Sequence, residues 1–132
     1  MGKEFSNPEG LYEPRAYSHV ITVTGGKILF ISGQIAFDSA GELVGAGDFR
    51  AQVQQVFKNL ELAVQGVGGS LNDIIKITIF IPNYDLAVHR PILNEVRSAV
   101  FGSHAPASSL VGVQALVFPE ILIEIEAVAV IG

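Results

Sequence analysis

The chain has 132 residues, 49% of them hydrophobic and 16% charged, with a net charge of −5 and no cysteine. This length predicts one domain over residues 1–132, and the missing cysteines exclude disulfides, thiolate catalysis and cysteine-ligated metals. The acidic balance gives no general attraction to nucleic acid or to anionic membranes. Because no apolar run approaches the roughly 20 residues of a membrane helix, we expect a cytoplasmic protein without membrane contact.

The first half of the chain predicts two strands and a helix. Residues 19–23 are short and β-branched, residues 27–36 form a longer apolar run, and Gly25 and Gly26 lie between them, which predicts a hairpin. A glycine-rich loop over residues 38–47 leads to Asp48, a good helix N-cap. Apolar residues then recur every three or four positions up to Val67, and Gly66, Gly68 and Gly69 end the run, which predicts an amphipathic helix of about five turns.

The second half predicts a strand, a helix and two further strands. Residues 74–81 are almost entirely apolar and stop at Pro82. A helix is expected from about residue 86 to 101, although Pro91 fits best in a first turn, which would move the start to His89 or Arg90. The last strands are predicted over residues 108–117 and 122–131, joined by a turn at residues 118–120.

The resulting order, β-β-α-β-α-β-β, predicts an α+β fold in which two helices cover one face of a single mixed sheet. The residues expected on the covered face are Ile75, Ile77, Ile79, Ile81, Ile123 and Ile125. The residues expected on the opposite face are Ile28, Phe30, Ser32, Gln34, Lys76, Thr78, Phe80, Glu124, Glu126, Val128 and Val130. This second face is too apolar to face water and too polar for an ordinary core, so we expect it to pack against other copies of the chain.

Three short motifs resemble the signature of a known family. They are Ser32-Gly33-Gln34, the pair Pro106-Ala107 and the run I-E-I-E-A over residues 123–127. At these separations they resemble the Rid family, also called YjgF or L-PSP, over about residues 17–130. The resemblance implies a chorismate-mutase-like homotrimer with inward-facing sheets and a small-molecule pocket at each subunit boundary. The best-known members hydrolyse reactive imines and enamines, and we expect no cofactor.

Glu124 is the candidate catalytic residue. It lies within a strand on the mixed face, where a carboxylate is costly unless it is paired or hydrogen-bonded. From the residues alone it is either a proton acceptor for water or an interface carboxylate paired with a cation of a neighbour. The resemblance favours the first reading, because the first glutamate of the family motif helps to position the water. Glu126, two residues further on, is interpreted as structural.

Five other residues are expected to bind the ligand. Ser32 and Gly33 would line the pocket, where a glycine lets a ligand approach the backbone, although Gly33 could also mark a strand bulge. Tyr17 would stack on the ligand at the pocket mouth, or else be an amphipathic surface tyrosine. Ala107 and Ser108 would supply backbone donors to the same pocket.

Ser108 departs from the family pattern, which reads P-A-R. Arginine grips a carboxylate through two parallel hydrogen bonds, whereas serine offers one neutral hydroxyl, and losing such a charge-assisted contact costs about 1.5–3 kcal/mol. A standard 2-imino acid would therefore need another cation, for which the sequence offers Arg15, Arg90 and Arg97. The three histidines show no metal-ligand spacing, so no metal is expected.

Three functions are consistent with this pattern. The first is a hydrolase that releases ammonia from a small imine, enamine or related C–N compound other than a standard 2-imino acid. The second is a non-catalytic trimer that binds a metabolite in the same pocket. The third is a ribonuclease or translation inhibitor, against which the acidic charge and the lack of a basic aromatic patch argue.

Overall fold

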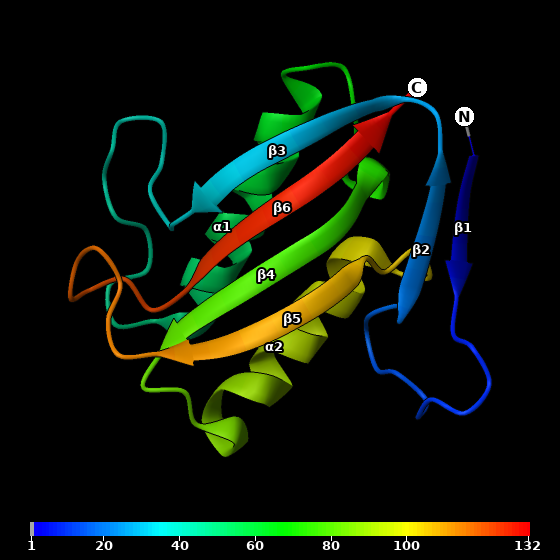
Figure 1. Ribbon diagram of the computed structural model, residues 1–132. Coiled ribbons are helices and arrows are strands. Elements are labelled where there is room, and N and C mark those ends of the chain that lie inside the picture. The colour runs from blue at the N-terminus through cyan, green and yellow to red at the C-terminus, as the bar shows by residue number, and fades with distance from the viewer. Residues whose placement is uncertain (1) are drawn as a thin grey trace.

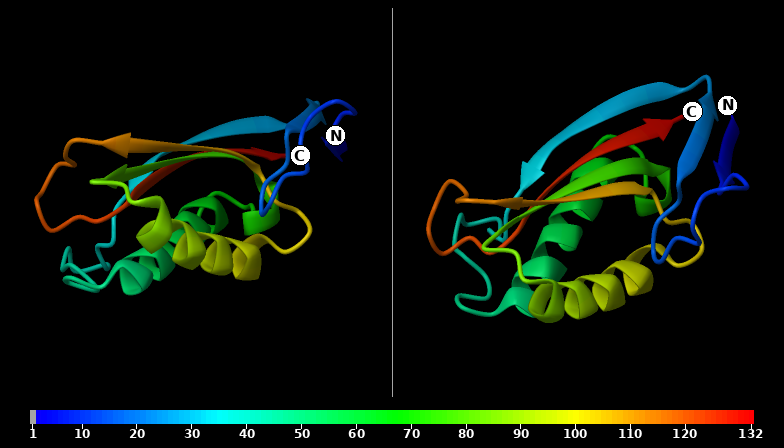
Figure 2. Two further views of the ribbon diagram at one scale, coloured as in Figure 1. Left: turned by 90° about the horizontal axis from the view of Figure 1, so that it is seen from below. Right: turned by 60° about the horizontal axis from the view of Figure 1, so that its bottom comes forward.

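The computed structural model describes residues 2–132. The elements in chain order are β1 (Gly2–Ser6), β2 (Val20–Thr24), β3 (Lys27–Gln34), α1 (Phe49–Gln65), the 3₁₀ turn η1 (Leu71–Asp73), β4 (Ile74–Pro82), α2 (Leu86–Phe101), β5 (Ala107–Val113) and β6 (Glu124–Ile131). Four strands form a mixed sheet in the order β3-β6-β4-β5, in which only the β4–β5 pairing is parallel within the described residues. Both helices lie on one face of this sheet (Figures 1 and 2), which confirms the predicted fold class.

The predicted hairpin between the first two expected strands is wrong. β2 pairs with β1, from Gly2 opposite Thr24 to Ser6 opposite Val20, whereas β3 pairs with β6 in the larger sheet. Gly25 and Gly26 both have positive φ, and the chain passes between the two sheets at this point. The β1–β2 pair stands beside the end of the large sheet where β3 begins and β6 ends (Figure 1).

The two helices begin at aspartate caps. Asp48 accepts a hydrogen bond from the Ala51 amide at 3.1 Å, and α1 ends at Gln65, just before the first of the three predicted glycines and two residues before Val67. Asp85 caps α2 in the same way, so this helix begins at Leu86 and contains Pro91 in its second turn. The alternative start at His89 or Arg90 is therefore wrong.

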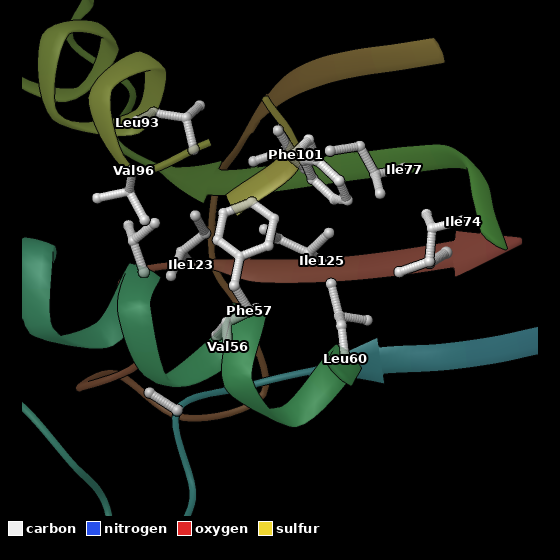
Figure 3. Close-up of a cluster of buried hydrophobic side chains, with 14 of the residues drawn as sticks. Val56, Phe57, Leu60, Ile74, Ile77, Leu93, Val96, Phe101, Ile123 and Ile125 are labelled. Atoms are coloured by element: carbon white, nitrogen blue, oxygen red, sulfur yellow. The ribbon is translucent and has the colours of Figure 1, made fainter. Parts of the chain in front are cut away.

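The core lies between the sheet and the two helices (Figure 3). Phe57 of α1 meets Phe101 of α2 edge to face, with ring centroids 5.6 Å apart. Their partners from the sheet are fully buried isoleucines on alternate positions of β4 and beside the start of β6, as the period of two requires. These isoleucines are Ile77, Ile79, Ile81, Ile123 and Ile125.

Ile75 and Gln34 lie on the face opposite to the predicted one. Gln34 is opposite the buried Ile125 and lines a hollow with residues of α1, because the β3–β6 register shifts between Ile31 and Gln34.

Ile75 is displaced by a shift in β4. The β4–β6 register shifts between Ile74 and Lys76, so two successive residues of β4 point the same way. Ile74 is fully buried in the core, whereas Ile75 lines an apolar hollow on the open face together with Phe30. The open face exposes large apolar side chains, with Ile28 62% and Phe30 83% accessible to solvent.

A partly buried ion pair ties the first strand to the rest of the molecule. Lys3 of β1 donates to Asp73 of η1 at 2.7 Å. Partial burial favours the neutral acid, but the hydrogen bonds from Lys3 and the Ser70 amide outweigh it and lower the pKa of Asp73 below its ordinary 3.8.

Removing this pair should cost stability at neutral pH and nothing in acid. The pKa of Asp73 is lower in the folded state than in the unfolded state. The ionised carboxylate therefore stabilises the fold at pH values above the ordinary pKa, and this stabilisation is lost as the pH falls through the pKa of the folded state. Lys3→Met should therefore lower the free energy of unfolding by about 1 kcal/mol at pH 7. Urea unfolding at pH 7 and in acid measures this; equal stability of the two proteins at pH 7 would contradict it.

Candidate functional site

The six site residues predicted from the sequence lie in two groups: five belong to the four-stranded sheet, and Tyr17 lies in a loop beside it. Ser32 and Gly33 of β3 lie beside Glu124 of β6, because these two strands are neighbours. The second group is formed by Ala107 and Ser108 of β5 and Tyr17 of the loop before β2; this loop hydrogen-bonds to the segment before β5. Each group is built in a different way.

Glu124 lies directly over Gly33. A Cβ atom placed on Gly33 would come within 2.2 Å of the Glu124 Oε2 atom, so only glycine leaves room for this carboxylate. The β3–β6 register also shifts between Ile31 and Gln34, which leaves Ser32 and Gly33 in a bulge outside the regular ladder. The bulge that the sequence offered as one interpretation of Gly33 is therefore present, and the space left by the missing side chain is taken by the Glu124 carboxylate.

Tyr17 is held next to β5 by its neighbours. Ser18 is buried, its hydroxyl donates to the Ala105 carbonyl at 2.6 Å, and its amide donates to the Pro106 carbonyl at 3.2 Å. Ala16 has a φ of 62°, a region that costs a non-glycine residue on the order of 1 kcal/mol. Desolvation, together with the hydrogen bond to Tyr12, raises the pKa of the Tyr17 phenol, which is therefore neutral at pH 7.

Arg97 of α2 occupies the space in front of Ser108. Its Nη1 atom donates to the Ser108 hydroxyl at 2.9 Å, and its Nη2 atom donates to the Asn94 side chain at 2.7 Å. The guanidinium carbon lies 6.0 Å from the centre of the Tyr17 ring. Burial lowers the pKa of Arg97 from its ordinary value, although an arginine keeps its charge at neutral pH. The helix thus places a cation directly beside Ser108.

These side chains surround a cavity of about 350 Å³ between α2, β5 and the loop before β2. Its lining includes Tyr12, Arg15, Tyr17, Arg90, Arg97 and Ser108. Neither Gly33 nor Glu124 is among its lining residues.

The two groups are too far apart to act on one small molecule within a single copy. Glu124 is opposite Phe80 of β4, and Ser108 is opposite Ile77 of the same strand. Two strand spacings and three residues along the strand separate their backbones by roughly 14 Å. The Ser108 side chain points to α2, whereas Glu124 and Phe80, which are opposite each other, lie on the open face of the sheet.

Arg97 is the site residue whose place the sequence did not fix. The sequence offers it only as one of three available arginines. A signal was nevertheless present, because Arg97 follows Leu93 by four positions and precedes Phe101 by four, which puts it on the buried stripe of α2. A charged residue on such a stripe is a candidate for function or for a buried pair.

Comparisons with known proteins agree with the motifs. The family model described as endoribonuclease L-PSP matches residues 11–131. A RutC family protein of Pyrococcus horikoshii is 40% identical over 109 residues, which cover 81% of this chain and 82% of that protein. A 2-iminobutanoate/2-iminopropanoate deaminase of Dermatophagoides farinae is 34% identical, with coverage of 87% and 85%.

A solved structure from Yersinia pestis matches nearly the whole chain. It is described as a protein of unknown function of the conserved Rid family, with 37% sequence identity and a TM-score of 0.92. The match covers 99% of this chain and 100% of that one. The fold, the three motifs and the relatives agree, and the chain belongs to the L-PSP family, which also carries the name Rid.

Proposed function

We propose that this protein is a deaminase-type hydrolase that converts a reactive imine or enamine, or a related C–N compound, into a carbonyl compound and ammonia. The observation that carries this proposal is the carboxylate of Glu124 lying over a glycine, in the motif expected to position water. The deaminase name of a relative with 34% identity supports the same chemistry. Because Ser108 with Arg97 beside it stands where the family pattern has a single arginine, we expect the substrate to differ from a standard 2-imino acid in the anionic groups that it presents.

The active site is proposed to form between two copies of the chain. β3 and β5 are the outer strands of the sheet, so the Glu124 group and the Ser108 group lie towards opposite edges. In a closed ring of three copies, the β5 edge of each copy meets the β3 edge of the next, which brings the two groups together. The exposed apolar side chains of the open face, Ile28 and Phe30 among them, would be buried inside this ring.

The proposed reaction needs one water and one carboxylate. Glu124 accepts a proton from water as the water oxygen attacks the C=N carbon, giving a carbinolamine. Glu124 returns its proton to the nitrogen, the C–N bond breaks as the carbinolamine hydroxyl loses its proton to form the carbonyl, and ammonia leaves. An enamine first takes a proton on carbon to become the imine. Backbone N–H groups near Ser32 and Ser108 orient the substrate in this scheme.

An imine-trapping assay tests the function. An amino-acid oxidase generates a series of imines in situ, semicarbazide traps them, and the protein competes with the trap by hydrolysing them. Suppressed trapping for at least one imine is expected. If the protein binds a ligand saturably but suppresses trapping for no imine, it would instead be a non-catalytic binding protein. If it hydrolyses no imine but cleaves RNA, it would be a ribonuclease.

Gly33→Ala should damage the site without damaging the fold. The new methyl group would displace the Glu124 carboxylate, which lies 2.2 Å from the Cβ position and can rotate away. A displacement of about 1 Å can cost up to about a hundredfold in rate, so we expect a loss of about ten- to a hundredfold. Turnover by the variant measures this. Gly33→Ala should cause no further loss in a Glu124→Gln background, and additive losses would show that it acts elsewhere.

A further inference from the structure

Arg97 is a buried cation without an anionic partner among residues 2–132. Its exposed fraction is 6%, and both of its hydrogen-bonded partners, Ser108 and Asn94, are neutral. Its Nε atom is buried and has no hydrogen-bond partner. An unpaired buried charge is strongly destabilising unless an anion compensates it. The guanidinium lines the cavity described above, so an anion that enters the cavity can reach it.

Two more arginines line the same cavity nearer to solvent. Arg15 and Arg90 are exposed and also line an adjoining hollow of about 710 Å³. The ion pairs of the described residues are Lys3–Asp73 and Arg50–Glu95, so neither of these arginines is paired there. Glu13, which lines the adjoining hollow, offsets one of the three positive charges. Two net positive charges thus gather at one cleft of a chain whose overall charge is −5.

We propose that this cleft binds the substrate as a small dianion, with one carboxylate on Arg97 and a second anionic group on Arg90 and Arg15. The inference rests on the proposed function, because it names the class of molecule on which Glu124 would act. The inner carboxylate supplies the acceptor that the Nε atom lacks and neutralises the buried charge. The outer group selects a dicarboxylic imine or enamine over a monocarboxylic one.

Binding of two stable oxo acids of equal length tests this directly. 2-Oxopentanedioate and 2-oxopentanoate have the same five carbons and differ by one carboxylate; both replace the C=N bond by C=O. Calorimetric titration of the assembled wild-type protein should show at least about tenfold tighter binding of the dicarboxylate. Equal affinities, or no binding of either acid, would overturn the proposal.

Variants assign the two anionic groups to their arginines. Arg97→Met should weaken both acids at least about tenfold, whereas Arg15→Gln combined with Arg90→Gln should abolish only the preference for the dicarboxylate. Arg50→Gln is the matched control, since Arg50 pairs with Glu95 on the exposed side of the helices, and should bind both acids as the wild type does. If the Arg97→Met variant bound both oxo acids with wild-type affinity, the assignment would be overturned.

Thermal unfolding separates a ligand-binding arginine from a structural one. Without ligand, Arg97→Met should melt at or above the wild-type temperature, because it replaces an unpaired buried charge by an apolar side chain of similar length. A strongly lowered melting temperature would show that Arg97 is paired within the assembly, and would overturn the proposal. These experiments need no turnover, so they can fail while imine hydrolysis is observed, and they can succeed where it is absent.

Discussion

Replacing Glu124 by glutamine should slow imine hydrolysis by about 10²–10⁴-fold, the range expected when a general base is lost. Glutamine keeps the size of the side chain that lies over Gly33, but its amide cannot accept a proton from water. The variant should therefore fold, assemble and bind the oxo acids as the wild type does. The rate with the best imine found in the trapping assay measures the effect.

Glu126→Gln is the matched control for this variant. Glu126 lies two residues along the same strand and on the same face, opposite Thr78, and its charge acts on Lys76. Glu126 has no role in the proposed chemistry, so the Glu126→Gln variant should hydrolyse the imine at a rate within a few-fold of the wild type. If Glu124→Gln hydrolysed as fast as Glu126→Gln, Glu124 would be an interface carboxylate rather than the general base.

The largest loss of stability from a single polar residue is expected at Gln52. This side chain is fully buried, and its amide nitrogen donates to the carbonyls of Gly45 and Glu120, each at 3.0 Å. Its oxygen accepts from the Leu122 amide at 2.9 Å. Gln52→Leu would remove the partner of three backbone groups in part-buried surroundings, which should cost about 3 kcal/mol.

Gln54→Leu provides the comparison, because Gln54 is exposed on the same helix. Urea unfolding at a fixed protein concentration should show a change within about 0.5 kcal/mol for that variant. Equal stability of the two variants would mean that water replaces all three hydrogen bonds. Gln52→Leu should also lower turnover even where it is folded, since Leu122 leads directly into the strand that carries Glu124.

The sequence predicted the elements whose signals are local. The apolar period and the Asp48 cap located α1, and the isoleucine run located β4, because packing against one core imposes those periods. The motifs singled out Glu124 and Gly33 separately, but the contact between them depends on the pairing of β3 with β6.

Features that depend on distant partners were missed. β1 is polar and short, so nothing in its own residues indicates a strand; it forms because β2 offers it an edge. The bulge that turns Ile75 to the open face arises from the register with β6 rather than from β4 alone. Arg97 could be placed beside Ser108 only once the angle between α2 and β5 was known.

Mixing two impaired variants, one in catalysis and one in substrate binding, at a limiting substrate concentration tests the central claim, that each active site takes one group from each of two copies. Glu124→Gln and Arg97→Met would be unfolded together, refolded at equal concentrations and assayed for imine hydrolysis. Random assembly into a ring gives an intact pair of groups at about a quarter of the subunit boundaries, so about a quarter of the wild-type rate should return. A mixture no more active than its two components, with mixed assemblies verified by mass spectrometry, would contradict a site shared between copies.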